Sequence, residues 1–183
     1  MNRLKVILNL IYGLFIYFLR GSVFYARKKG VKIGDNCRIY IKEWGSEPFL
    51  ISIGDNVTIT SGVRFITHDG STCLIFDENK QRYQRYAPIN IGSNVFVGVN
   101  TIIMPGVNIG SNVVIGAGSI VTKDIPSNSV VVGCPAKPVS SFEAYEEKIK
   151  NTCASNSDLN HIAFDEYQKR VFHAIEIQKV KHR

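Results

Sequence analysis

The sequence predicts a mainly β fold, a parallel β-helix solenoid in which short strands coil around one hydrophobic core. Between residues 89 and 126 an aliphatic residue returns every six positions, at Ile91, Val97, Ile103, Ile109, Ile115 and Val121. Six is neither the period of an α-helix nor that of a strand. A tetrapeptide of an aliphatic residue, Gly, Asp or Ser, and Asn begins at Ile33, Ile53, Ile91 and Ile109. Hexapeptide repeats of this kind indicate a parallel β-helix.

The six-residue period has a simple geometric reading. Three faces of six residues close one coil of eighteen, so each aliphatic residue stacks on the residue eighteen positions later, as Ile91 does on Ile109. Successive coils then pair as parallel strands about 4.8 Å apart. Gly, Asn and Asp suit the corners, where the backbone turns sharply and sometimes needs a positive φ. The period alone does not give the hand of the coil.

Three regions follow from the extent of the repeats. Residues 1–30 are predicted as an apolar helical segment, residues 31–139 as the β-helix, and residues 140–183 as a helical extension whose last helix covers 164–179. The repeats break at 39–50, an irregular face, and at about 68–88, a projecting loop. A loop of that length inside a compact repeat array is usually functional.

The apolar segment Leu4–Leu19 allows two interpretations. It is shorter than the roughly 20 residues that span a bilayer, and no small-residue cleavage site follows it. It is either a helix packed on the domain or on a neighbouring subunit, or a helix at a membrane interface flanked by basic residues. We expect a cytoplasmic protein with either interpretation. The second adds membrane-surface contact through residues 1–20, at the inner face of the membrane.

The charge and cysteine content of the chain limit the kinds of ligand and partner that we expect. The formal net charge is +7, with a pI near 9.3, which suits an anionic partner such as a phosphate-rich cofactor or a membrane surface. The basic residues are scattered and form no nucleic-acid motif, so we expect no nucleic acid. Four cysteines without CxxC pairing predict no metal site and no disulfide framework, and read as small buried hydrophobic residues.

Specific motifs connect residues 31–139 to a family. They are THDG at 67–70, PINIGSNVFVG at 88–98, PGVNIGSNVVIGAGSIVTKDIP at 105–126 and GCPAKPV at 133–139. This region resembles the hexapeptide-repeat acyltransferases with a left-handed β-helix, in the branch of galactoside, maltose and polysaccharide O-acetyltransferases. The resemblance implies a homotrimer with active sites between subunits, acetyl-CoA as acyl donor, no metal, and direct transfer to a hydroxyl or amine.

His68 is the candidate catalytic residue. It is the only histidine in the repeat region, and it stands where a coil ends and the long loop begins. A neutral imidazole can take the proton of an attacking hydroxyl, and the family's base matches this position. The alternative is a loop histidine with structural hydrogen bonds. Asp69 is expected in a turn or at the acceptor, because adjacent residues of an extended chain point in opposite directions. The group that orients His68 is not identified by the sequence.

The resemblance also assigns a cofactor site. A backbone N–H at Gly98 or Val99 would bind the oxyanion, although relatives carry serine at the second position. The other positions that match the family's coenzyme A contacts are Phe96, Gly116, Ala117, Thr122, Lys123 and Lys137. The alternative for each glycine is a corner of the coil, and for each lysine a solvated surface position.

The residues that we expect to bind the acceptor lie in the long loop. Tyr83, Arg85 and Tyr86 mix aromatic and basic character, which suits a sugar that carries a phosphate. The same residues would also suit a loop that packs on itself or on the next subunit. Glu43 and Trp44, in the first irregular segment, are candidates to line the same cleft.

The predicted function is an acetyl-CoA-dependent O-acetyltransferase that acts on a sugar or polysaccharide-precursor acceptor. The segment FITHDGS resembles members found in capsule, exopolysaccharide and lipopolysaccharide biosynthesis, so surface polysaccharide is the expected product. Alternatives are an N-acetyltransferase of an amino sugar, an antibiotic acetyltransferase and, outside the enzymes, a structural β-helix scaffold. A carbonic anhydrase on this solenoid needs three histidines around zinc, and the repeats hold only His68.

Overall fold

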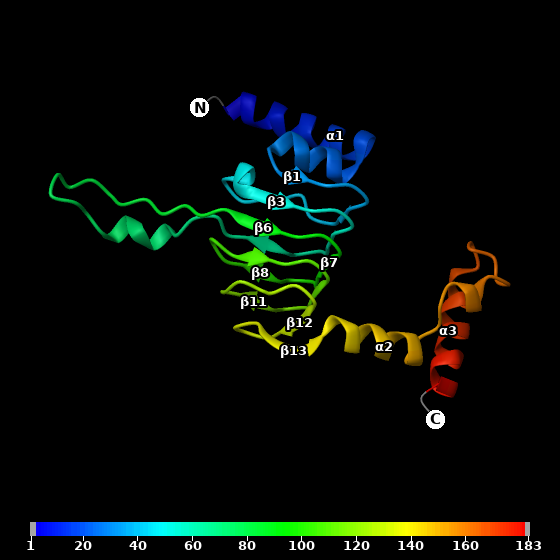
Figure 1. The fold of residues 1–183 in the computed structure, drawn as a ribbon. Coiled ribbons are helices and arrows are strands. Elements are labelled where there is room, and N and C mark those ends of the chain that lie inside the picture. Colours follow the sequence, from blue (N-terminus) through cyan, green and yellow to red (C-terminus); the bar gives the residue numbers. More distant parts are fainter. Residues whose placement is uncertain (1–2, 182–183) are drawn as a thin grey trace. The chain divides into compact units, whose positions relative to one another are not determined.

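The computed structural model describes residues 3–181, and the side chains of residues 15–181. The chain divides between Val139 and Ser140 into two compact units, which are described separately. Figure 1 shows the stack of coils that makes up most of the first unit.

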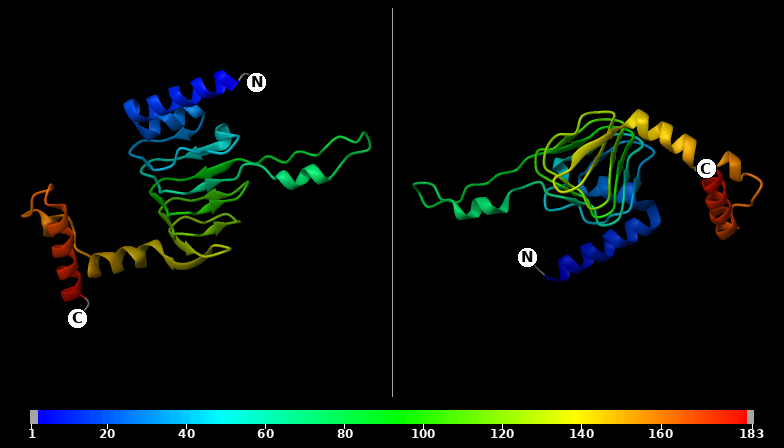
Figure 2. Two further views of the ribbon diagram at one scale, coloured as in Figure 1. Left: turned by 180° about the vertical axis from the view of Figure 1, so that it is seen from behind. Right: turned by 90° about the horizontal axis from the view of Figure 1, so that it is seen from below.

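Three sheets form the sides of the first unit (Figures 1 and 2), and their strands pair in parallel from one coil to the next. The first sheet holds β1 (Lys32–Ile33), β3 (Ile51–Ile53), β6 (Ile89–Ile91) and β9 (Asn108–Ile109). The second holds β2 (Arg38–Ile39), β4 (Thr58–Ile59), β7 (Val95–Val97), β10 (Val113–Ile115), β12 (Ser129–Val132) and β13 (Lys137–Ser141). The third holds β5 (Arg64–Phe65), β8 (Ile102–Ile103) and β11 (Ile120–Val121).

The strand register confirms the predicted stacking. Ile91 pairs with Ile109, Val97 with Ile115, and Ile103 with Val121, each eighteen positions later. These aliphatic side chains are buried in one continuous core. The first coil is longer than the repeat predicts, because Ile33 pairs with Ile53. The last coil is shorter, because Ile109 pairs with Ile125.

The repeated tetrapeptide forms the corner between the first and second sheets. Its asparagines adopt a positive φ, at Asn36, Asn56, Asn94 and Asn112. Its glycines lie where consecutive coils come closest: a Cβ built on Gly92 would lie 2.8 Å from the backbone of Gly110. Two constraints therefore explain the motif: the corner needs a residue that tolerates positive φ, and the close spacing of coils needs a residue without a side chain.

Helix α1 (Arg3–Lys29) lies over the first coil (Figure 1). It is interrupted at Gly21, where φ is 82° and ψ is 170°. Ala26, in its second half, is fully buried in the common core, whereas Phe15, Phe18 and Leu19 in the first half are exposed. The side chains before residue 15, part of the predicted membrane-contact segment, lie outside the described residues. Within the described part of the chain, no helix is long and apolar enough to cross a bilayer.

The second break in the repeats is an arm that projects from the coils between His68 and Ala87 (Figure 1). Its two sides meet in antiparallel bridges, His68 with Tyr86 and Phe76 with Arg82. One side carries the 3-10 helix η2 (Gly70–Leu74). A shorter 3-10 helix, η1 (Pro48–Leu50), lies in the irregular segment before β3.

The second unit is helical. It contains α2 (Phe142–Thr152), the 3-10 helix η3 (Ser157–Leu159) and α3 (Tyr167–Lys181). The Ser141 hydroxyl caps α2 by accepting a hydrogen bond from the Ala144 N–H. The helix predicted at 164–179 is thus found slightly later in the sequence.

The prediction that the cysteines are buried is wrong. Cys73 and Cys134 are exposed, and Cys37 and Cys153 are partly exposed. Cys73 lies on the projecting arm and Cys134 follows the last full coil, so neither position faces the core.

Candidate active site around His68

His68 is placed by the strand before it and the arm after it. Thr67 accepts the Ala87 N–H at 2.9 Å through its backbone oxygen, which closes the base of the arm. The His68 side chain is 42% exposed, and its Nδ1 lies 3.0 Å from Oε2 of Glu47. The same carboxylate oxygen accepts the Thr67 hydroxyl at 2.6 Å. An imidazole with one nitrogen open to solvent and the other on a carboxylate is arranged as a base with its positioning partner.

The charge state of Glu47 supports this arrangement. The Thr67 hydroxyl and, after it, the hydrogen bond from His68 lower the pKa of Glu47, and together they outweigh desolvation, which would raise it. Glu47 is therefore ionised at neutral pH and can accept a hydrogen bond from Nδ1–H. In the neutral tautomer that donates this hydrogen bond, Nε2 is the nitrogen without a proton.

Glu47 is the functional residue that the sequence analysis missed. It lies in the irregular segment 39–50, twenty positions before Thr67, which is one turn of the first long coil. A carboxylate one coil before the candidate base was the available signal. Segment 39–50 lacks the six-residue period, so the repeats do not show which of its residues lies beside Thr67 and His68 in the next coil.

A cavity of about 400 Å³ opens beside His68. It brings together four residues that the sequence analysis predicted: His68, Asp69, Arg85 and Thr122. The remaining lining residues are Ile66, Gly70, Met104 and Pro105. They come from the ends of β5, β8 and β11 and from both sides of the arm.

The Asp69 carboxylate is hydrogen-bonded to Ser71 and is not the group that orients the His68 imidazole. Its carboxylate accepts the Ser71 N–H at 3.0 Å and the Ser71 hydroxyl at 2.6 Å, which caps η2. These hydrogen bonds lower the pKa of Asp69, and Arg85, at 3.7 Å, lowers it further. Asp69 is a turn residue that holds Arg85 at the cavity.

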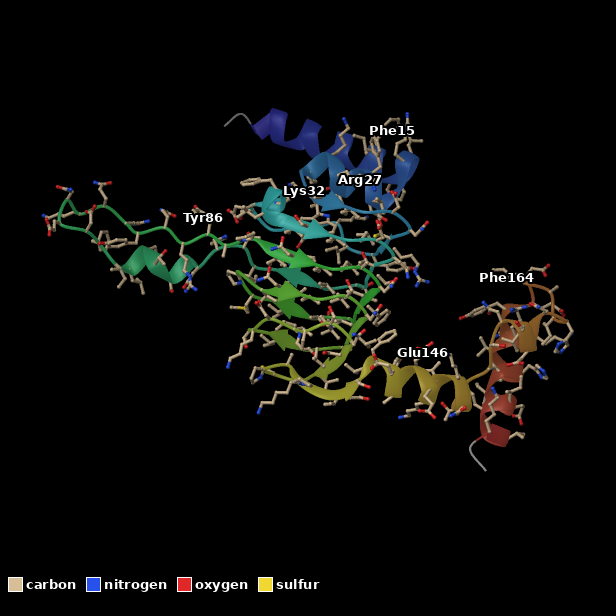
Figure 3. All side chains as sticks on the ribbon, in the orientation of Figure 1. Phe15, Arg27, Lys32, Tyr86, Glu146 and Phe164 are labelled. Atoms are coloured by element: carbon tan, nitrogen blue, oxygen red, sulfur yellow. The ribbon has the colours of Figure 1, made fainter. Side chains whose placement is uncertain are left out.

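The predicted acceptor tyrosines differ in position. Tyr86 lies at the base of the arm (Figure 3), with its ring centroid 6.1 Å from that of His68. Tyr83 is exposed farther along the arm and lines none of the cavities described here. Tyr86 is therefore close enough to contact a substrate bound at His68. Tyr83 is too far from the His68 of its own chain to do so.

Most predicted cofactor residues lie at a different corner. Phe96 is exposed on β7. The second sheet turns into the third after β7, at Gly98 and Val99, and again after β10, at Gly116 and Ala117. His68 and Thr122 follow strands of the third sheet, at its other edge. Lys123 and Lys137 are exposed after β11 and in β13. One chain alone does not bring the two groups together.

The two candidate oxyanion donors are not equivalent. The Gly98 N–H already donates to the Ile115 oxygen at 2.8 Å in the coil. A Cβ at Gly98 would lie 2.5 Å from the Ala117 nitrogen, so this glycine is required for packing. No acceptor is found for the Val99 N–H among the residues described, which leaves Val99 as the candidate donor.

Glu43 and Trp44 do not line the His68 cavity, so the prediction that they share its cleft is wrong. They line a separate cavity that includes residues of α1. Among residues 15–181 no group of three or more His, Cys, Asp and Glu side chains is placed to hold a metal ion.

Comparisons with known proteins agree with this architecture. A family model described as hexapeptide repeat of succinyl-transferase matches residues 88–123. Protein CapG of Staphylococcus aureus is 52% identical over 138 residues, which are 74% of this chain and 80% of CapG. The galactoside O-acetyltransferase of Escherichia coli K12 is 38% identical over 125 residues, 68% of this chain and 57% of that protein.

A solved structure agrees as well. The maltose O-acetyltransferase from Clostridium difficile 630 is 36% identical, covers 61% of this chain and 59% of its own, and superposes with a TM-score of 0.53. This chain thus spans less than two thirds of the two named O-acetyltransferases. The resemblance drawn from the motifs is confirmed, and with it the enzyme class: the chain belongs to the hexapeptide-repeat acetyltransferase family.

Proposed function

We propose that the protein is an O-acetyltransferase that moves an acetyl group from acetyl-CoA to a hydroxyl of a carbohydrate, on a left-handed β-helix. The observation that carries the proposal is the hydrogen bond between Glu47 and His68, a residue that lines a cavity of about 400 Å³. Two relatives are named for acetylating a galactoside and maltose, which favours a sugar acceptor.

The mechanism uses Nε2 of His68 as the general base. Glu47 accepts a hydrogen bond from Nδ1–H and fixes the ring, so the Nε2 lone pair is left to act on a substrate in the cavity that His68 lines. The acceptor oxygen attacks the thioester carbonyl while its proton passes to Nε2, which forms the new C–O bond. The oxyanion is stabilised by the Val99 N–H. Collapse breaks the C–S bond, and the imidazolium returns its proton to the departing coenzyme A sulfur.

The active site is proposed to form between subunits of a homotrimer. His68 and the predicted cofactor residues Phe96, Val99 and Ala117 lie at opposite edges of the third sheet. A second copy can place its Val99 corner against the His68 edge of the first. Gly116, Thr122, Lys123 and Lys137 would then line the coenzyme A path, and Asp69, Arg85 and Tyr86 the acceptor side.

The protein is proposed to act in the cytoplasm, in the biosynthesis of surface polysaccharide. Exposed Phe15, Phe18 and Leu19 share one face of α1, at spacings of three and four residues. Arg20 and Lys28 lie along the same helix. An apolar face with flanking cations is suited to the membrane interface, where polysaccharide precursors carried on lipids would be met.

The test is release of free thiol from acetyl-CoA with a panel of hexoses, amino sugars and polysaccharide repeat units. We expect release that requires a hydroxyl acceptor and falls by roughly 10²–10⁴-fold in His68→Ala. His161→Ala, in the second unit, is the matched control and should keep full activity. Transfer only to amines would favour an amino-sugar or antibiotic N-acetyltransferase. No binding of acetyl-CoA would overturn the proposal in favour of a structural scaffold.

A further inference from the structure

A second cavity lies next to the His68 cavity, on the side of α1. Its volume is about 430 Å³. It is lined by two residues of α1, the irregular segment and β5: Tyr25, Lys29, Lys42, Glu43, Trp44, Gly45, Pro48, Arg64, Phe65 and Ile66. Ile66 lines both cavities. The two cavities therefore adjoin at Ile66, within the span of one extended ligand.

The lining of this cavity carries net positive charge. Three cations, Lys29, Lys42 and Arg64, face one carboxylate, that of Glu43. Arg64 Nη1 lies 2.6 Å from Glu43 Oε2, so this pair neutralises itself. The charge that remains belongs to the two lysines.

Both lysines are positioned by aromatic rings instead of carboxylates. Lys42 Nζ lies 4.7 Å from the ring centroid of Tyr17 and 5.4 Å from that of Phe18. Lys29 Nζ lies 5.4 Å from the ring centroid of Tyr25. In the described part of the chain, no carboxylate oxygen lies within 4.0 Å of either ammonium group. A cation–π contact holds an ammonium group without cancelling its charge, so both remain available to an anion.

The wall of the cavity is well packed and is continuous in sequence with the segment that carries Glu47. Trp44 is buried and stacks on Phe65, with ring centroids 5.4 Å apart and planes at 18°. Gly45, at φ 74°, turns the chain immediately after it. The same short segment carries Lys42 at the cavity and, five residues later, Glu47 at His68.

We infer that this second cavity binds the phosphate of a phosphorylated sugar acceptor, with Lys29 and Lys42 as its ligands. Ammonium groups are compact, strongly hydrated charges that bind phosphate as point charges. The phosphate would lie in this cavity while the sugar passes Ile66 and presents a hydroxyl to His68. The inference rests on the proposed function, because it defines which class of sugar that function acetylates.

Binding can be measured without catalysis, because Trp44 is the only tryptophan of the chain. We would titrate the protein with galactose 1-phosphate and with methyl galactoside, and follow tryptophan fluorescence. A saturable change is expected with the phosphate ester and not with the neutral glycoside. Lys29→Gln and Lys42→Gln should each weaken binding about tenfold, whereas Lys42→Arg should keep most of it. Lys32→Gln is the matched control, because Lys32 lies in the first coil (Figure 3) and does not line the cavity.

Kinetics provide the second arm. The kcat/KM for the phosphate ester should exceed that for the neutral glycoside, and only the former should fall in Lys42→Gln. Equal effects of Lys42→Gln on both acceptors, or fluorescence titrations unchanged by either lysine substitution, would overturn the inference. Failure of all carbohydrate acetylation while phosphate-ester binding persists would instead overturn the proposed function.

A further arm identifies the source of the phosphate. Galactose 1-phosphate in solution is compared with a polyprenyl-diphosphate-linked galactose in vesicles. Preference for the vesicle substrate that is lost in Phe15→Ser, which alters an exposed residue of the apolar face of α1 that does not contact Lys42, would assign the phosphate to a lipid-linked sugar. Equal use of the two would assign it to a soluble sugar phosphate. Either result requires the two lysines.

Discussion

At the residue scale, the Glu47–Thr67–His68 contacts form one unit. Glu47 contacts His68 and Thr67 but lines neither cavity, so it acts by positioning. Glu47→Gln can still accept a hydrogen bond from Nδ1–H through its amide oxygen, but it loses the charge that stabilises the imidazolium. We expect kcat to fall about 10- to 100-fold with little change in the acceptor KM, as measured by thiol release. Glu47→Asp should recover part of the loss. A change confined to KM would contradict the positioning role.

The same carboxylate predicts a dependence of stability on pH. The pKa of Glu47 in the folded protein lies below its ordinary value of 4.5. Its stabilising contribution is therefore complete above about pH 5 and is lost as the pH falls through the lowered folded pKa. Between pH 7 and pH 3 the wild type should lose more unfolding free energy than Glu47→Gln, by urea denaturation. Equal losses would show that Glu47 is not preferentially ionised in the folded state.

At the element scale, the stacking of coils sets the limits on substitution. A Cβ at Gly92 would meet the Ser111 hydroxyl at 2.6 Å and the Gly110 backbone at 2.8 Å. Gly92→Ala should therefore lower the free energy of unfolding by about 1–3 kcal/mol, the usual cost of overpacking. Gly70→Ala is the control, because an added Cβ there meets nothing within 4 Å. Urea midpoints at constant m-value would decide between them. A loss as large at Gly70 would mean that coil spacing is not the cause.

The elements also show what the sequence can and cannot predict. The register of Ile91, Ile103 and Ile109 follows from the six-residue period, because every coil imposes the same interior positions. The irregular segment and the arm have no period, so their contacts are set by tertiary packing that spacing alone does not encode. This is why His68 could be predicted from its place at the end of a coil together with the family resemblance, whereas Glu47 and the cavity lined by Trp44 could not. The prediction that the cysteines are buried failed for a related reason: residue type predicts burial less well than position in the coil does.

At the scale of the whole molecule, the candidate site is incomplete within one chain. His68 and Thr122 share a cavity, but Val99 and Ala117 lie at the other corner of the third sheet. The arm exposes Leu74, Ile75 and Phe76, three adjacent apolar side chains. Exposed apolar residues on one projecting element are expected to be covered by a partner. A second copy of the chain would cover them and complete the site at the same time.

A mixing experiment tests this shared site. His68→Ala removes the base, and Ala117→Trp blocks the proposed coenzyme A path, so each variant alone should be inactive. In trimers of mixed subunits, the intact His68 of one variant can face the intact Ala117 corner of the other. Co-expression should therefore restore a fraction of the activity, on the order of a quarter if subunits mix at random and sites act independently. The control pair, His68→Ala with Glu47→Gln, alters the same side of the site and should give no more activity than the Glu47→Gln subunits alone. Absence of recovery in trimers that sediment as such and that copurify on a tag carried by only one variant would place the whole site within one chain.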